Sequence, residues 1–269
     1  EINQNIAAGL PTPISEEAAQ LLKKSATLST KSSDLFNPAI GKLIALWGFH
    51  GESWTGPPPP QSTIDPLLKS KPRMDQLQFE NGTLRSSNPA VQIDLGGIAK
   101  GYAVDRAIEQ LKQLGIRDAI VNTGGDLRAI GSHGRRNWNI GIRAPDGGDP
   151  IASIQPQGDE SIFTSGDYER MFLYQGERYH HIIDPTTGWP ATGTRSVTVI
   201  HPDATTADAA ATALLVASPT ARTTVAQQLG IDKLLIIDDH GRLHLTESMA
   251  QRLNFHQQPP PIVERLVIR

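Results

Sequence analysis

The pattern of hydrophobic and polar positions predicts strands joined by tight turns and interrupted by a few helices. Alternating residues surround Asn-Gly in 77–85 and Gln-Gly in 171–184, and 233–245 has the same pattern, which is typical of β-hairpins. Helical spacing with a capping residue at one end predicts helices over the following ranges: 16–28, 98–115, 206–217 and 219–230. Runs of antiparallel hairpins broken by helices indicate an α+β fold, not an alternating βαβ array.

Composition narrows the class of protein. The 269 residues suit one large domain or two closely packed lobes, with the run Pro57 to Pro60 as the expected seam. A net charge of −3 gives no reason to expect a nucleic-acid partner. The absence of cysteine excludes disulfides, thiolate zinc sites and cysteine nucleophiles. No apolar stretch approaches the roughly 20 residues that a membrane-spanning helix needs.

The stretch TTADAAATALLV, residues 205–216, places Asp208 and Thr212 four residues apart in an otherwise apolar helix. Residues at this spacing lie on one helix face, so their oxygens can converge on a hard cation such as Mg²⁺ or Ca²⁺, together with a backbone carbonyl from elsewhere. A structural role fits the pair equally well, because an aspartate near a helix N-terminus complements the dipole and a helical threonine can bond a carbonyl one turn earlier. The pair alone leaves both interpretations open.

A second candidate is the corner VQIDLGGIAKG, residues 91–101, which predicts a strand ending in a glycine pair before the next helix. In a functional interpretation Asp94 anchors a ligand hydroxyl or ring, the Gly97 carbonyl binds a metal, and Lys100 supplies a positive charge for phosphate. The alternative is a tight corner with a solvated lysine. Neither a Walker A loop nor a Rossmann glycine fingerprint is present.

Three further stretches combine polar residues with turns: NTGGDL (122–127), FTSGDY (163–168) and HHIIDPTTG (180–188). The first two equally fit β-turns in which glycine takes a positive φ. In the third, a histidine beside an aspartate turn is a candidate general base, since its near-neutral pKa suits that role. A strand that simply ends in an Asp-Pro-Thr-Thr-Gly turn is the alternative.

Read together, these stretches resemble the FAD:protein FMN transferase family, the ApbE flavin transferases. The family pattern D-L-x-x-I-A-K-G-Y-x-x-D matches Asp94 to Asp105, and A-D-A-x-x-T-A matches Ala207 to Ala213. The remaining matches, in chain order, are L-W-G-F at 46–49, G-G-D at 124–126, T-S-G-D-Y at 164–168 and H-I-I-D-P-x-T-G at 181–188.

The resemblance implies a T-fold-like α+β architecture, rich in antiparallel sheets with packed helices, as a single domain over 1–269. It implies an enzyme that takes FAD as substrate and, with Mg²⁺, cleaves its pyrophosphate. FMN is then esterified through its phosphate to a threonine hydroxyl of an acceptor protein, and AMP is released. Acceptors of the family are subunits of membrane electron-transfer complexes.

Site residues follow from the same resemblance. The metal is expected on the Gly97 carbonyl, Asp208 and Thr212. The residues expected to contact FAD are Asp94, Lys100 and Ile183, with the turn Leu35, Phe36 and Asn37 holding the nucleotide. His181 is the expected general base, with Asp184 as an alternative or an orienting partner. Mg²⁺ and Lys100 would offset the charge that develops on the diphosphate.

The chain departs from the family pattern at several points. Gly97 stands where many members have Ala or Thr, and Ala211 stands where some have a second Asp, which predicts a weaker or partly water-filled metal shell. No family opening Met-Gly-Thr strand precedes Glu1, so the sequence predicts a processed or trimmed chain without the N-terminal part of the family domain. The expected location is the bacterial periplasm, with a lipid anchor on a removed N-terminal segment attaching the protein to the inner membrane.

Two other functions use the same residues. A Mg²⁺-dependent FAD pyrophosphatase would give free FMN and AMP, because only the attacking group differs. A carrier without turnover would bind FAD and release no AMP. The Ser/Thr-Gly-Ala-Thr signature that the family recognises in its acceptors is absent here, so the acceptor is expected to be a different protein.

Overall fold

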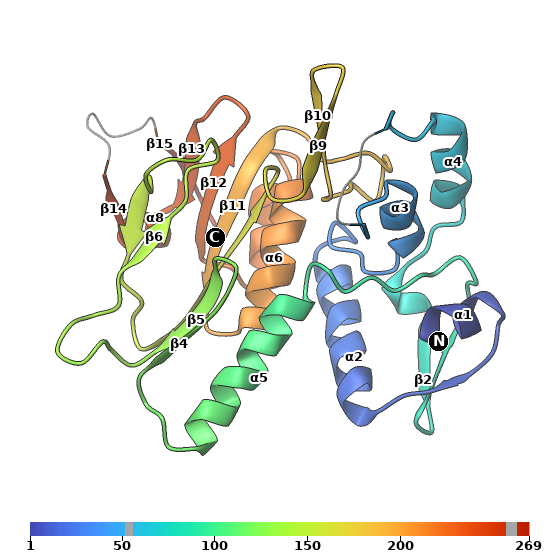
Figure 1. Cartoon of the computed structure of the whole chain (residues 1–269), viewed down its shortest axis with the longest axis horizontal. Coiled ribbons are helices and arrows are strands. Elements are labelled where there is room, and N and C mark those ends of the chain that lie inside the picture. Colours follow the sequence, from blue (N-terminus) through green and yellow to red (C-terminus); the bar gives the residue numbers. More distant parts are fainter. Residues whose placement is uncertain (52–55, 257–262, 269) are drawn as a thin grey trace. The chain divides into compact units, whose positions relative to one another are not determined.

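Hairpins and helices are arranged in two units in the computed structural model, which describes residues 1–51, 56–256 and 263–268 (Figure 1). Unit 1 comprises Glu1–Gly97 and Glu169–Ala191, and unit 2 comprises Ile98–Tyr168 and Thr192–Arg269. The proline run at 57–60 lies inside unit 1, immediately before a helix. The expectation of a single domain stays a prediction.

Unit 1 combines short helices with two small antiparallel sheets. One sheet has the strand order β1-β3-β2, and the other is the hairpin β9-β10. The elements are α1 (Ile2–Ala7), β1 (Thr12–Pro13), α2 (Glu16–Lys31), α3 (Gly41–Leu46), α4 (Gln61–Lys69), a 3₁₀ turn η1 (Met74–Gln76), β2 (Leu77–Glu80), β3 (Thr83–Ser86), β9 (Met171–Tyr174) and β10 (Glu177–His180).

The predicted start of α2 and both predicted hairpin turns of unit 1 are confirmed. The Ser15 side chain accepts a hydrogen bond from the Ala18 N–H and caps α2. Asn81 and Gly82 have φ values of 48° and 74°, and Gln175 and Gly176 have 52° and 84°. Two consecutive positive φ angles are the signature of a type I′ turn, whose twist matches that of the flanking strands.

The strand predicted over 91–97 is wrong. Only an isolated bridge between Ile40 and Gln92 forms there. The Gln92 N–H donates to the Ala39 carbonyl and the Asp94 N–H to the Pro38 carbonyl, so the segment pairs with the loop before α3 instead of joining a sheet. The alternating pattern was correct in predicting extended backbone, but no adjacent strand lies there to continue a ladder.

Unit 2 is built on a seven-stranded sheet in the order β15-β13-β12-β11-β8-β5-β4, in which only β13 and β15 are parallel. A three-stranded sheet, β14-β7-β6, accompanies it. The elements are α5 (Ala99–Gln113), β4 (Ala119–Thr123), β5 (Asp126–Ile130), β6 (Ile140–Ile142), β7 (Ala152–Ile154), β8 (Asp159–Gly166), β11 (Thr194–His201), α6 (Ala204–Val216), α7 (Arg222–Leu229), β12 (Lys233–Asp238), β13 (Leu243–Thr246), α8 (Glu247–Ala250), β14 (Leu253–Phe255) and β15 (Val263–Leu266). The predicted α+β fold, rich in antiparallel sheets with packed helices, is confirmed.

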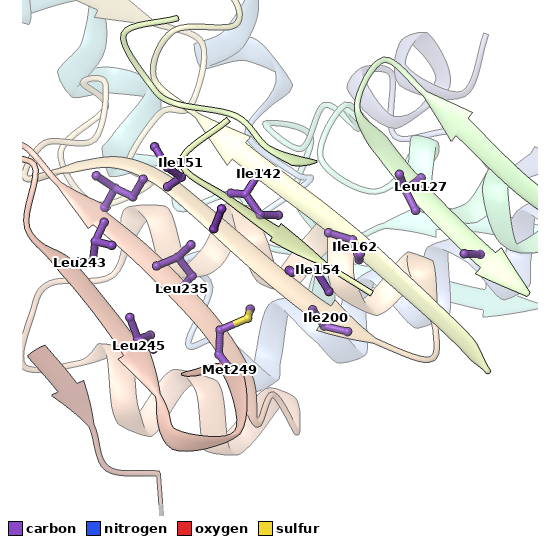
Figure 2. Close-up of a cluster of buried hydrophobic side chains, with 13 residues drawn as sticks. Leu127, Ile142, Ile151, Ile154, Ile162, Ile200, Leu235, Leu243, Leu245 and Met249 are labelled. Atoms are coloured by element: carbon purple, nitrogen blue, oxygen red, sulfur yellow. The ribbon is translucent and has the colours of Figure 1, made fainter. Parts of the chain in front are cut away.

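The two sheets of unit 2 enclose one apolar cluster (Figure 2). Ile162, Ile200 and Leu235 from the large sheet share it with Ile142 and Ile154 from the small one. Because side chains alternate along a strand, Val197 and Val199 point to the opposite face, where α6 packs on β8 and β11. The sheet is therefore covered on both faces.

Helix α6 is buried almost all round, which decides the environment of every polar group on it. Ten of its thirteen residues are buried, Asp208 among them. A helix that is apolar on all sides belongs in the interior of a protein. No helix in the described ranges is long and apolar enough to cross a membrane.

Candidate active site

The candidate residues divide between the two units. Unit 2 holds Lys100, Asp208 and Thr212. Unit 1 holds Leu35, Phe36, Asn37, Asp94, Gly97, His181 and Ile183. Gly97 is the last residue of its segment and directly precedes Ile98, the N-cap residue of α5.

In unit 2, helices α5 and α6 cap each other. The Gly101 N–H, in the first turn of α5, donates to Oδ2 of Asp208 on α6 at 2.9 Å. In return, Asp105 of α5 accepts hydrogen bonds from the backbone N–H groups of Ala204 and Thr205, at 2.9 and 2.8 Å, in the first turn of α6. First-turn N–H groups have no partner within their own helix, so each aspartate satisfies donors of the other helix and lies at its positive dipole end.

This mutual capping requires the helices to approach closely at Gly101. A Cβ atom at this position would lie 2.7 Å from the Ala204 carbonyl carbon and 2.8 Å from the Thr205 Cα. Real Cβ atoms essentially never come within 3.0 Å of other heavy atoms, and both neighbours are backbone atoms that cannot rotate away. Glycine is therefore needed at 101 for the backbone of α5 to reach Asp208.

Asp208 is a buried carboxylate in a charged neighbourhood. Its residue is 4% exposed. Burial raises the pKa of Asp208 to about 7, the charge of Asp126 adds to this effect, and the Gly101 hydrogen bond and the charge of Lys100 oppose it. Lys100 forms an ion pair with Asp126, so a cation and two carboxylates are grouped within unit 2.

The donor set fits a hard cation. Thr212 lies one turn beyond Asp208 on α6, and its Oγ1 is 3.4 Å from the Ser165 Oγ. Mg²⁺ binds carboxylate and hydroxyl oxygens. A bound cation would stabilise the ionised form of a buried carboxylate, which burial otherwise disfavours. Within the described ranges no three His, Cys, Asp or Glu side chains come together as a metal site. A cation held here would therefore also need hydroxyl, carbonyl, water or substrate oxygens.

Asp126 and Thr164 were singled out in the sequence only as members of turns. In the structure, Oδ1 of Asp126 accepts from the Thr164 N–H at 2.8 Å, while Oδ2 pairs with Lys100. The glycine turn considered for 122–127 is present, with φ of 71° and 107° at Gly124 and Gly125. The one considered for 163–168 is wrong, because residues 163–166 belong to β8 and Gly166 is not among the glycines with positive φ. The sequence thus showed the Gly-Gly-Asp motif, but only the fold shows that its aspartate forms an ion pair with Lys100.

The sequence patterns also gave no structural role to Asp105, and we expect this residue to be critical for the stability of the fold. It accepts from the two α6 amides, from the Thr205 hydroxyl at 2.6 Å and from Arg128, so Asp105→Asn removes a buried charge that faces only donors. Breaking such a buried network typically costs about 3–5 kcal/mol. Denaturant unfolding should show this loss, with weaker Mg²⁺ binding because the N-terminus of α6 is released.

The matched control is Asp159→Asn, which removes the other carboxylate on Arg128. Asp159 is one-third exposed and caps no helix, so its loss should cost about 1 kcal/mol and leave Mg²⁺ affinity unchanged. Equal losses from the two variants would contradict the special role of Asp105.

In unit 1, Asp94 is held by two contacts. Its Oδ1 accepts from the Gly96 N–H at 2.8 Å, and its Oδ2 lies 2.7 Å from Nε2 of His50. The sequence patterns gave no indication of a role for His50, because it directly follows the L-W-G-F stretch and belongs to no motif. The pairing leaves Asp94 22% exposed, so its carboxylate remains accessible to a polar ligand.

The predicted nucleotide turn at 35–37 closes the end of α2. The Phe36 N–H bonds to the Ser32 hydroxyl, and its ring is buried. The Asn37 side chain is used at both ends, because it accepts from the Ala39 N–H and donates to the Pro72 carbonyl, each at 3.0 Å. The turn is thus held by several hydrogen bonds, and Leu35 and Asn37 are its partly exposed residues.

His181 lies at the base of the β9-β10 hairpin. Its N–H donates to the Arg170 carbonyl at 3.0 Å, and Nδ1 lies 3.3 Å from the same oxygen. The ring of Phe49 meets the imidazole edge to face at 6.3 Å, and the Arg170 side chain donates to the Phe49 carbonyl. A carbonyl beside Nδ1 favours the tautomer with the proton on Nδ1, which leaves the lone pair on Nε2.

The turn at residues 184–188 forms a contact that gives the L-W-G-F stretch a structural role. Trp47 is fully buried and donates its indole N–H to the Gly188 carbonyl at 2.8 Å. Asp184 accepts from the Thr186 N–H through its side chain, so its carboxylate is engaged in the turn. Ile183 is buried in the cluster around Trp47, which means that only its backbone is available to a ligand.

Comparison with known proteins identifies the family. The model of the ApbE family matches residues 1–235. A Rhodobacter capsulatus protein named FAD:protein FMN transferase is 39% identical over 257 residues, covering 94% of this chain and 48% of the relative. A Treponema pallidum protein of the same name is 35% identical over 254 residues, covering 87% of this chain and 69% of the relative. The chain therefore spans about half the length of the first relative and about two-thirds of the second.

Solved structures agree. The ApbE protein of Thermotoga maritima superimposes with a TM-score of 0.85 at 36% identity, covering 96% of this chain and 84% of that one. The flavin transferase ApbE of Vibrio cholerae gives a TM-score of 0.81 at 31% identity, with 93% and 81% covered. The resemblance inferred from the motifs is confirmed, and the chain belongs to the ApbE family.

Proposed function

We propose that this protein transfers FMN from FAD to a threonine hydroxyl of an acceptor protein, with Mg²⁺ as cofactor and AMP as the second product. Its membership of the ApbE family and the activity for which its relatives are named support this reaction. The observation that carries the proposal is the buried Asp208, held against the N-terminus of α5 with Thr212 one turn away and the Lys100–Asp126 pair beside it.

Asp208 and Thr212 would hold the metal, with the Gly97 carbonyl as the proposed third ligand. A bound Mg²⁺ would neutralise charge on the diphosphate of FAD. Lys100 adds a positive charge for phosphate oxygens, and Asp126 keeps its ammonium group in place through the ion pair. Asp94, Ile183 and the turn at 35–37 are the proposed FAD contacts.

In the reaction a phosphorus–oxygen bond of the diphosphate breaks, a phosphorus–oxygen bond to threonine forms, and the threonine proton goes to a base. His181 is the proposed base, because the Arg170 carbonyl at Nδ1 favours a lone pair on Nε2. We expect His181→Ala to slow transfer about 100- to 1000-fold while the dissociation constant for FAD stays unchanged, as measured by flavin fluorescence.

The control is His133→Ala, an exposed histidine of unit 2 outside the proposed site, which should transfer at the normal rate. A normal rate for His181→Ala as well would remove His181 as the base and leave the choice of base open.

The reaction itself is tested by mixing the protein with FAD, Mg²⁺ and a recombinant electron-transfer subunit that contains a Ser/Thr-Gly-Ala-Thr segment. Flavin fluorescence on the denatured acceptor band, with one AMP per flavin attached, supports transfer. Free FMN with AMP and an unlabelled acceptor would indicate a pyrophosphatase, and unchanged FAD would indicate a carrier.

We further propose that the acceptor belongs to a membrane electron-transfer complex and that the full-length protein acts in the bacterial periplasm on a lipid anchor. Fractionation of cells that express the full-length gene tests this location. Recovery of the protein in the cytosolic fraction would contradict it.

A further inference from the structure

In the β9-β10 hairpin of unit 1, β9 has one buried side and one exposed side, whereas His180, opposite Met171 on β10, is buried. Phe172 and Tyr179 stack with ring centroids 5.2 Å apart, and Phe172 packs into the aromatic cluster with Phe49. Met171 and Leu173 alternate with these residues, so they point to the other face, where they are 41% and 65% exposed. Figure 1 shows the tip of this hairpin standing apart from the other elements of unit 1.

Two large apolar side chains exposed on one short strand are unusual. Among the described residues only six large hydrophobic side chains are exposed, and two of them are these neighbours on β9. Apolar groups that gather on a surface commonly mark a binding site, whereas isolated ones need no explanation.

The hairpin is continuous with the proposed base. His181 directly follows β10, and both its N–H and its Nδ1 lie against the carbonyl of Arg170, the residue before β9. The start of β9 and the end of β10 therefore both lie next to His181. A polypeptide bound to the exposed face would have its nearest residues beside the proposed transfer site.

We infer that the exposed face of β9, formed by Met171 and Leu173, is the docking surface for the acceptor protein. The occupant is a folded protein whose threonine-bearing segment runs along the hairpin toward His181. This inference rests on the proposed function and adds to it the element that selects the protein substrate. Apolar contacts by a few exposed side chains commonly dominate the affinity of such an interface.

The test is flavin transfer by Leu173→Ser and Met171→Ser in the whole protein. Three quantities are measured: the KM for the recombinant acceptor subunit, the kcat/KM for a short peptide with the same Ser-Gly-Ala-Thr segment, and the dissociation constant for FAD. The expected result is a KM for the folded acceptor raised about tenfold, with peptide transfer and FAD binding unchanged. The matched control is Leu114→Ser in unit 2, which removes a side chain that is 68% exposed and should change none of the three.

Each other outcome overturns the inference. An unchanged KM in variants of an active enzyme would show that β9 does not bind the acceptor, with the proposed function intact. Weaker FAD binding would show that the face contacts FAD. An equal fall in kcat/KM for the peptide would show that the face affects catalysis and not the recognition of the folded acceptor. Dimers in sedimentation that Leu173→Ser dissociates would show a second copy there. No flavin transfer by the unmodified protein would refute the proposed function and this inference together.

Discussion

Asp208→Ala is expected to reduce Mg²⁺-dependent turnover of FAD by about 1000-fold, the size of effect seen when one preorganised electrostatic group is removed from an active site. The variant removes the only carboxylate in the proposed metal shell and leaves the Gly101 N–H without its acceptor. Isothermal titration with Mg²⁺ in the presence of FAD should show no metal uptake. Full activity would mean that the metal is held elsewhere.

Asp208→Asn separates the two roles of this side chain. An asparagine oxygen can still accept from Gly101, so the mutual cap of α5 and α6 should survive while the charge is lost. Because the pKa of Asp208 is raised in the folded state, ionisation of this group destabilises the metal-free protein as the pH rises through about 7. We therefore expect metal-free Asp208→Asn to be at least as stable as the native chain at pH 8, yet inactive. A fall in both stability and activity would instead indicate a purely structural aspartate.

Local signals predicted the parts of the fold that local chemistry decides. Asn81-Gly82 and Gln175-Gly176 form the expected turns because only a few residue types accept two positive φ angles. The helix predicted to carry Asp208 and Thr212 forms as α6, in a run of Ala, Leu and Val that is apolar on nearly every side. Residues 91–97 show the limit of such signals, because alternation predicts extended backbone but not whether a neighbouring strand exists.

The site residues that were missed act over long sequence separations. Asp105 caps amides about 100 residues away, and the Asp126–Lys100 pair joins the start of β5 to α5. Nothing in the spacing around Asp105 distinguishes a helix-capping carboxylate from a solvated one. His50 likewise gains its role only because the chain brings Asp94 beside it.

Gly101→Ala is expected to lower the free energy of unfolding by about 2–3 kcal/mol, in the upper part of the usual range for overpacking against immobile neighbours. Helix propensity alone predicts the opposite sign, since alanine in a helix is favoured over glycine by about 1 kcal/mol. The added Cβ would meet the backbone of Ala204 and Thr205, so α5 and α6 must separate. Separation lengthens the bond from Gly101 to Asp208, and turnover should fall with stability.

The reverse exchange on the same helix shows which effect decides the sign. Ala103 is exposed, so Ala103→Gly changes only propensity and should lower the free energy of unfolding by about 1 kcal/mol without affecting turnover. Denaturant titration of both variants compares the two directly. If Gly101→Ala proved more stable than the native chain, the close approach of the helices would not exist in solution. The account of Asp208 as a carboxylate held by the N-terminus of α5 would then fail, because that contact depends on the glycine.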